Sequence, residues 1–179
     1  SIEQLIRNIF VENNIKKRLY EITGFNYSID FLLGYSTYNI DEVSKKNDIY
    51  ANHWHRDKPF SKNTLKIIIP VNEISNNDGP MEIMSIQDSS KIKFSLDLKN
   101  TNFLNKSKLV GTEKNIFFFL PNLCYHRAGI PLANHKRTQI MLQLNPSKKW
   151  KYSVNLYKKQ YLLEPKFPLL NLNDDYKLI

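Results

Sequence analysis

The residues best suited to chemistry lie in one short stretch, His53-Trp54-His55-Arg56-Asp57. Side chains of an extended chain alternate between two faces, so positions 53, 55 and 57 are expected on one side and positions 54 and 56 on the other. A His and a carboxylate two positions apart can hold one metal ion if a further ligand comes from elsewhere in the chain. The structural alternative is a His-Asp pair at the surface or in a cap.

His126 is the candidate for that further ligand. It follows the apolar run of residues 116–120 and the turn-forming pair Pro121-Asn122. Two His and one carboxylate on one face of an ion form the facial triad of non-haem iron(II) oxygenases, which leaves positions open for substrate and oxygen. Arg137, eleven residues after His126, offers a rigid fork for a carboxylate, as a 2-oxo-acid cosubstrate requires.

The elements that must position these residues are mostly short strands. Apolar residues in the segment 2–22 recur at steps of three and four, which predicts an amphipathic helix that ends at Gly24. After it, short runs rich in Ile, Phe, Tyr and Val alternate with turn-forming residues, a pattern typical of a sandwich or barrel. The predicted strands cover residues 30–40, 49–55, 65–74, 81–84, 116–120 and 138–144, with a further helical stretch near 97–103.

The chain length indicates one domain. With 179 residues, 41% of them hydrophobic, the chain can bury a substantial core without disulfides or structural metals. We predict a single domain over residues 1–179, with an N-terminal helix in 1–24, a β core in 30–145 and a C-terminal segment, 146–179, that wraps its outside. Cys124 is the only cysteine, which excludes an intramolecular disulfide and zinc sites with several thiolates.

No sequence signal for a membrane or for secretion is found. The apolar runs are far shorter than the ~20 residues that cross a bilayer, and the first residues mix charge with apolar positions and show no signal-peptide cleavage site. We therefore expect a cytoplasmic protein without a membrane partner.

The net charge of +9 raises the question of a nucleic-acid partner. Such a partner requires Lys and Arg gathered on one face. Of the 26 basic residues 21 are Lys, which are scattered from Lys16 to Lys177 in runs no longer than two. The charge therefore favours a solvated surface. A nucleic-acid-associated domain is the alternative, and it predicts salt-sensitive binding and no need for iron.

Several segments resemble the phytanoyl-CoA dioxygenase branch of the iron(II)- and 2-oxoglutarate-dependent oxygenases. The resemblance covers residues 30–145. It rests on His53-Trp54-His55-Arg56-Asp57, residues 65–71, Asp78-Gly79-Pro80-Met81, His126-Arg127-Ala128-Gly129, Arg137 and residues 139–144. It implies a mainly β fold with flanking helices, namely a double-stranded β-helix (a cupin-like jelly roll), with iron near one open end.

The resemblance also implies roles for individual residues. His55, Asp57 and His126 match the iron ligands, and Arg137 matches the residue that pairs with the distal carboxylate of 2-oxoglutarate. No catalytic residue beyond the metal ligands is implied. Because Asp57 retains the carboxylate that halogenating relatives replace, hydroxylation or a related oxidation is expected, with iron(II), 2-oxoglutarate and O₂ as cofactors and with succinate as the product of 2-oxoglutarate.

Four neighbouring residues have weaker assignments. Tyr38, or Tyr35, is a candidate to help bind 2-oxoglutarate, because Ala128 stands where some relatives carry a hydroxyl. His53 is a candidate substrate contact, and the alternative for it is a hydrogen-bonded structural histidine. Lys66 on the next strand could approach an anionic group, although a solvated lysine is expected there.

The sequence therefore predicts an enzyme, a 2-oxoglutarate-dependent non-haem iron dioxygenase that hydroxylates or otherwise oxidises a small molecule. The alternative from another class is a non-enzymatic jelly-roll protein that binds a metal or another ligand. The sequence identifies neither the substrate nor the oligomeric state.

Overall fold

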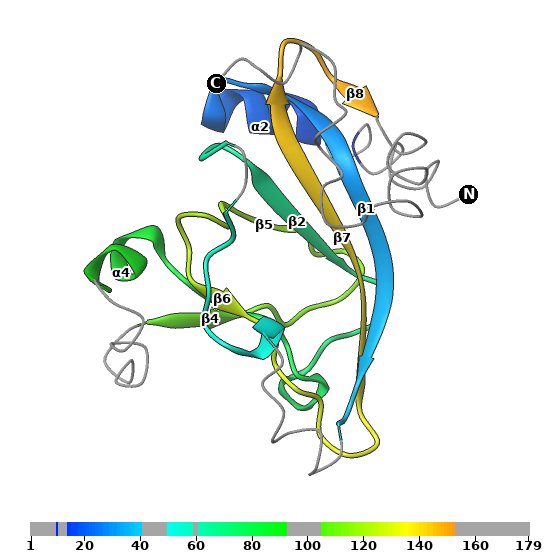
Figure 1. The fold of residues 1–179 in the computed structure, drawn as a ribbon. Coiled ribbons are helices and arrows are strands. Elements are labelled where there is room, and N and C mark those ends of the chain that lie inside the picture. The colour runs from blue at the N-terminus through cyan, green and yellow to red at the C-terminus, as the bar shows by residue number, and fades with distance from the viewer. Residues whose placement is uncertain (1–9, 11–13, 41–49, 59–60, 93–104, 153–179) are drawn as a thin grey trace, which may run out of the picture. The chain divides into compact units, whose positions relative to one another are not determined.

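The computed structural model describes residues 10, 14–40, 50–58, 61–92 and 105–152, and these form a mainly β structure with few helices, as predicted (Figure 1). The helices are α2 (Ile15–Thr23), α4 (Ile86–Lys91) and the short 3₁₀ helices Tyr50–Asn52 and Asn76–Asp78. The strands are β1 (Asn26–Tyr38), β2 (Leu65–Pro70), β3 (Glu82–Met84), β4 (Lys106–Lys108), β5 (Phe117–Phe119), β6 (His126–Arg127), β7 (Lys136–Ser147) and β8 (Lys151–Tyr152).

These strands form two sheets. One has the order β5-β2-β7-β1-β8, and the other has the order β4-β3-β6. The long strands β1 and β7 are neighbours in the first sheet, as Figure 1 shows. The chain divides into two compact units, one formed by residues 1–32 and 142–179 and the other by residues 33–141.

The first unit contains α2 and β8. Gly24 ends α2 in a left-handed conformation, with φ 76°, and its N–H donates to the carbonyl of Tyr20 at 2.8 Å. This is a common helix C-cap, so the predicted stop at Gly24 is confirmed. Strand β8 pairs in parallel with β1 in the register Ser28↔Lys151. Residues 1–9 and 11–13 of the predicted N-terminal helix lie outside the described residues.

The second unit holds every residue of the candidate site. Strands β2 and β5 pair antiparallel in the register Lys66↔Phe119. In the smaller sheet, β3 pairs with β4 and with β6, and Ile83 stands opposite His126. The two faces of β3 contribute to different clusters, since Ile83 packs against the core around Phe119 whereas Met84 packs with Trp54.

The strand prediction for residues 49–55 is wrong over Tyr50–Asn52, which form a 3₁₀ helix. Ala and Asn are both poor strand residues, and the Ala51 carbonyl accepts a hydrogen bond from the N–H of Ala128 instead of a ladder partner. Helix α4 was not among the predicted elements. Its N-cap, Ser85, accepts from the N–H of Asp88 at 3.0 Å, a capping pattern that was present in the sequence.

Other expectations concern residues beyond those that the structure describes. The helical stretch near 97–103 and most of the C-terminal segment 146–179 lie outside the described ranges. The single-domain assignment stays a prediction. Within the described ranges, no helix is both long and apolar enough to cross a bilayer.

Two glycines allow the loop before β3 to pack closely against the loop before β7. Gly79 has φ 63°, and a Cβ added there would lie 2.4 Å from the carbonyl carbon of Ile130. A Cβ on Gly129 would lie 2.5 Å from the carbonyl oxygen of Pro80. The carbonyl of Gly129 in turn accepts a hydrogen bond from Arg137, so this close approach helps to position the Arg137 side chain.

Substitution of Gly79 by Ala should therefore destabilise the protein more than substitution of Gly24. Both glycines have positive φ, but nothing lies within 4 Å of a Cβ at Gly24. Gly24→Ala should cost about 1 kcal/mol, the strain of a left-handed conformation, and Gly79→Ala about 1–3 kcal/mol more from steric overlap. Urea unfolding of both variants measures the difference. Equal losses would contradict the close approach of the two loops.

Candidate metal centre

A pair of backbone hydrogen bonds places His55 opposite His126. The N–H of His55 donates to the His126 carbonyl at 3.1 Å, and the N–H of His126 donates to the His55 carbonyl at 3.0 Å. Side chains of directly opposite residues in an antiparallel pair lie on the same face. The two imidazole rings accordingly lie 4.4 Å apart between centroids, although 71 positions separate them in the chain.

Asp57 completes a group of three candidate ligands. Its N–H donates to the Pro121 carbonyl at 2.9 Å, which continues the contact between the two segments. Its Oδ1 lies 3.6 Å from Nε2 of His55 and 3.6 Å from Nε2 of His126. One ligand atom from each residue lies within 4.8 Å of the others, as one shared metal ion requires. The structure thus brings together the three residues that the sequence analysis selected as metal ligands.

The hydrogen bonds of the two rings set their tautomers. Nδ1 of His55 lies 2.8 Å from the carbonyl of His53, and Nδ1 of His126 lies 3.0 Å from the carbonyl of Cys124. A carbonyl oxygen only accepts, so in the neutral rings the proton sits on Nδ1 and the lone pair on Nε2. Metal-binding histidines are commonly oriented in this way.

His126 provides a direct test of whether a metal fits. Its side chain is 2% exposed, and its Nε2 is buried without a hydrogen-bond partner. A buried polar atom without a partner is costly. A metal ion bound between this Nε2, the Nε2 of His55 and Oδ1 of Asp57 would satisfy it, so the residues present fit a metal centre.

Electrostatics keep His55 and Asp57 in their metal-binding protonation states. Burial, above all, lowers the pKa of the His55 imidazole, and the charge of Lys66 acts in the same direction. For Asp57, burial alone would raise the pKa, but contacts with His126 and Lys66 outweigh it and hold the pKa well below its usual range. At neutral pH the His55 ring is therefore neutral and the Asp57 carboxyl is ionised.

Lys66 contradicts the expectation of a solvated lysine. Its side chain is 14% exposed, and its ammonium forms an ion pair with Oδ2 of Asp57. The register explains this position, because Lys66 stands opposite Phe119 and the Phe119 ring lies 5.0 Å from the His126 ring. The sequence signal for this inward position was the spacing of two residues between Lys66 and Ile68, which places both on one face of the strand. Ile68 belongs to the same core cluster as Phe119.

Arg137 is a buried cation. Its side chain is 1% exposed, Nη1 donates to the Gly129 carbonyl at 3.2 Å, and Nη2 donates to Oγ1 of Thr37 at 3.3 Å. Its Nε is buried without a partner, and none of the carboxylates that the structure describes pairs with it. Burial lowers the pKa of Arg137, yet a guanidinium stays charged in proteins. A nearby anion offsets the cost of burying such a cation. The carboxylate of a bound ligand would supply that anion.

Alternation along β1 decides which of its side chains reach Arg137. Thr37 hydrogen-bonds Arg137, and the Tyr35 hydroxyl accepts from Nε2 of Gln139 on β7. Tyr38 lies on the other face of the strand and is 60% exposed. The structure therefore does not bring Tyr38 to Arg137. Thr37 lies beside Arg137 instead. The sequence does not show which residues of this strand face Arg137, so it could not distinguish Thr37 from Tyr38.

His53 takes part in the centre through its backbone. Its carbonyl orients the His55 ring, whereas its side chain is exposed. The expectation that positions 53, 55 and 57 share one face holds for His55 and Asp57, which approach each other. The role of His53 as a substrate contact stays a prediction.

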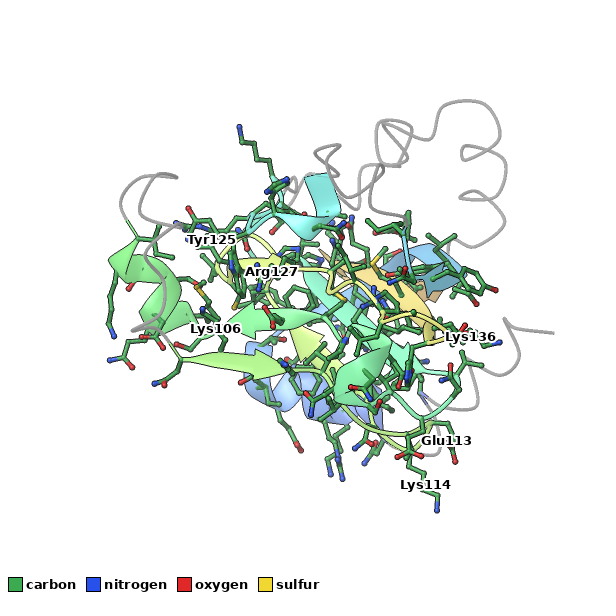
Figure 2. All side chains as sticks on the ribbon, turned by 90° about the horizontal axis from the view of Figure 1, so that it is seen from below. Lys106, Glu113, Lys114, Tyr125, Arg127 and Lys136 are labelled. Carbon is green, nitrogen blue, oxygen red and sulfur yellow. The ribbon has the colours of Figure 1, made fainter. Side chains whose placement is uncertain are left out.

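The other face of this region carries stacked cations. The Arg127 guanidinium lies 4.7 Å from the Trp54 ring centroid and pairs with Glu82, and the Arg56 guanidinium lies 4.3 Å from the Tyr125 ring centroid. Arg127 and Tyr125 are labelled in Figure 2. A cavity of about 300 Å³ is lined by Arg127 and Glu82 among others, but by none of the three candidate ligands. Trp54 and Arg56 thus pack within the fold.

Metal binding should weaken only on acidification. Since His55 and Asp57 are already in their ligand forms at neutral pH, Co(II) affinity should be nearly constant above about pH 7 and fall below about pH 6.5, where protons compete for imidazole nitrogen. Calorimetric titration of Co(II) between about pH 5 and about pH 8 measures this. His135→Ala is the matched control and should leave the curve unchanged. Loss of affinity already above pH 7 would contradict the lowered pKa of His55.

Comparison with known proteins identifies the fold. No protein-family model matches the chain, and no curated protein matches it. Among solved structures, the non-haem α-ketoglutarate-dependent epimerase SnoN from nogalamycin biosynthesis is similar, with 14% identity and a TM-score of 0.55. The match covers 79% of this chain and 56% of the SnoN chain.

Two further structures are more distant. The non-haem α-ketoglutarate-dependent carbocyclase SnoK from nogalamycin biosynthesis has 11% identity and a TM-score of 0.43, over 55% of this chain and 45% of its own. EvdMO1 has 10% identity and a TM-score of 0.44, over 64% of this chain and 27% of its own. The likeness to SnoN shows the cupin-like double-stranded β-helix that the resemblance implied. SnoN and SnoK depend on α-ketoglutarate, which is 2-oxoglutarate.

Proposed function

We propose that this chain is a 2-oxoglutarate-dependent non-haem iron enzyme that oxidises a small molecule, with His55, Asp57 and His126 as the iron ligands. One observation carries the proposal. Nε2 of His126 is buried without a hydrogen-bond partner, and it lies beside the two other atoms of a facial triad. The fold shared with SnoN supports the same assignment.

Arg137 is the proposed partner of the distal carboxylate of 2-oxoglutarate. Its unpartnered Nε is the donor available to that carboxylate, and Thr37 and Gly129 orient the guanidinium. Bound iron(II) with 2-oxoglutarate supplies the oxidising chemistry, in which O₂ is consumed and 2-oxoglutarate is converted to succinate and carbon dioxide. The protein binds and orients both groups. Thr37 replaces Tyr38 in this proposal as the hydroxyl beside Arg137.

The reaction proposed is hydroxylation or a related oxidation. Asp57 holds the position at which a halogenating enzyme needs space for halide, which argues against halogenation. Because SnoN is an epimerase, the fold is compatible with reactions other than hydroxylation. The strings His53–Asp57 and His126–Gly129 support a place in the phytanoyl-CoA dioxygenase-like branch. A small-molecule substrate and a cytoplasmic location complete the proposal.

Anaerobic titration with iron(II) and 2-oxoglutarate tests the centre. The wild-type protein should develop a visible metal-to-ligand charge-transfer band, and His55→Ala and Asp57→Ala should abolish it because each removes a ligand. His53→Ala is the neighbouring control and should keep the band. If the wild-type protein shows no band under conditions in which an established oxygenase does, the non-enzymatic jelly-roll alternative is favoured.

Thermal stability separates the proposed anion site from the metal site. Adding 2-oxoglutarate to the Mn(II)-loaded wild-type protein should raise its Tm, because the ligand binds the folded state only. Arg137→Met should lose most of this increase, since a hydrogen-bonded charge pair contributes about 1.5–3 kcal/mol, while keeping the increase that Mn(II) alone produces. Arg127→Met also removes a guanidinium and should retain both increases. An undiminished response of Arg137→Met to 2-oxoglutarate would contradict the assigned role.

A further inference from the structure

Lys66 is neither one of the proposed metal ligands nor part of the proposed 2-oxoglutarate site. It lies on β2 opposite Phe119, and the Phe119 ring packs edge-on against the His126 ring. The next residue on this face, Ile68, belongs to the buried core. A lysine among apolar residues needs a specific partner to offset the cost of burying its charge, and that partner is Asp57.

The two oxygens of the Asp57 carboxylate have different surroundings. Oδ1 lies 3.6 Å from Nε2 of each candidate histidine ligand, whereas Oδ2 forms the ion pair with Lys66. The Asp57 side chain is 25% exposed. A metal ion shared by the three residues would therefore meet Oδ1, because Oδ2 is already engaged by an ammonium donor.

The number of Asp57 oxygens that bind the metal determines how many of its coordination positions stay open. A facial triad in an octahedral site leaves three positions when its carboxylate binds through one oxygen. A 2-oxo acid that chelates through its carboxylate and oxo group fills two of them and leaves one. If Asp57 bound through both oxygens, the 2-oxo acid would fill every remaining position.

We propose that Lys66 is a positioning residue that holds Asp57 as a one-oxygen ligand and thereby keeps a third metal position open. The inference rests on the proposed function and goes beyond it, since it assigns Lys66 a task at the centre. Lys66 acts through Asp57 and does not itself bind the metal. Its ammonium forms a charge-assisted hydrogen bond, which is strong and directional, and the strand fixes where its side chain originates.

Counting the water molecules on bound Mn(II) tests this directly. Line broadening of the Mn(II) EPR spectrum in ¹⁷O-enriched water reports the metal-bound waters of the protein with Mn(II) alone. The wild-type protein should retain three waters. Lys66→Met, which removes the ammonium but keeps the length of the side chain, should retain one fewer because Oδ2 becomes free to bind the metal. Lys66→Arg restores a charged donor and should recover the wild-type number.

The water number with 2-oxoglutarate bound gives a second readout on the same samples. After saturation with 2-oxoglutarate, the Mn(II)-loaded wild-type protein should retain one metal-bound water and Lys66→Met none, because the 2-oxo acid then fills both positions that a two-oxygen Asp57 leaves open. Lys114→Met is the matched control. Lys114 is exposed, and Figure 2 shows it well away from Arg127 and Tyr125, so both readouts should remain at their wild-type values.

The outcomes separate this inference from the proposed function. Equal water numbers for Lys66→Met and Lys114→Met, both with and without 2-oxoglutarate, would overturn the role of Lys66 while leaving the metal centre intact. Failure of the wild-type protein to bind Mn(II) would contradict the centre itself. Should Lys66→Met not fold, as judged by circular dichroism, Lys66→Gln serves in its place. Its shorter, uncharged amide should shift both readouts in the same direction, and unchanged values would overturn the inference.

Discussion

The candidate centre depends on one backbone interaction, the reciprocal hydrogen bonds between His55 and His126. These bonds determine which face each side chain occupies. A slip of one residue would turn every side chain of a strand to the opposite face, so Arg127 would replace His126 beside Asp57. Arg127 now stacks on Trp54 and pairs with Glu82 on the other face, and both contacts favour the register that brings the histidines together.

Each histidine ring is oriented by its own segment of chain. The carbonyls of His53 and Cys124 lie two residues before His55 and His126, and each accepts from Nδ1 of its histidine. The orientation of each ring is therefore local, whereas the meeting of the two rings depends on long-range pairing. This separation explains why the spacing His-x-Asp and a later His could be recognised in the sequence, because alternation is a local property of the chain.

Other parts of the site were not predictable because they depend on strand phase. Tyr38 and Thr37 are adjacent, and the sequence alone does not show which of them faces Arg137. The same applies to Lys66, whose inward position follows from its pairing with Phe119. The 3₁₀ helix at Tyr50–Asn52 replaced a predicted strand, although a β-rich sandwich or barrel and most strands were predicted from apolar runs. Composition shows where strands form, but the partner strand decides which side chains meet.

Lys66 and Arg137, both largely shielded from solvent, are balanced in different ways. Lys66 is paired with Asp57, whereas among the described residues Arg137 has only neutral acceptors, the Thr37 hydroxyl and the Gly129 carbonyl. Under the proposed function, a divalent ion joins a carboxylate whose charge is already offset, so the metal alone leaves an excess of positive charge. The two carboxylates of 2-oxoglutarate offset that excess, one at the metal and one at Arg137. The positively charged metal and the negatively charged 2-oxoglutarate then favour each other's binding. Such coupling is reciprocal, so each raises the affinity for the other by the same factor.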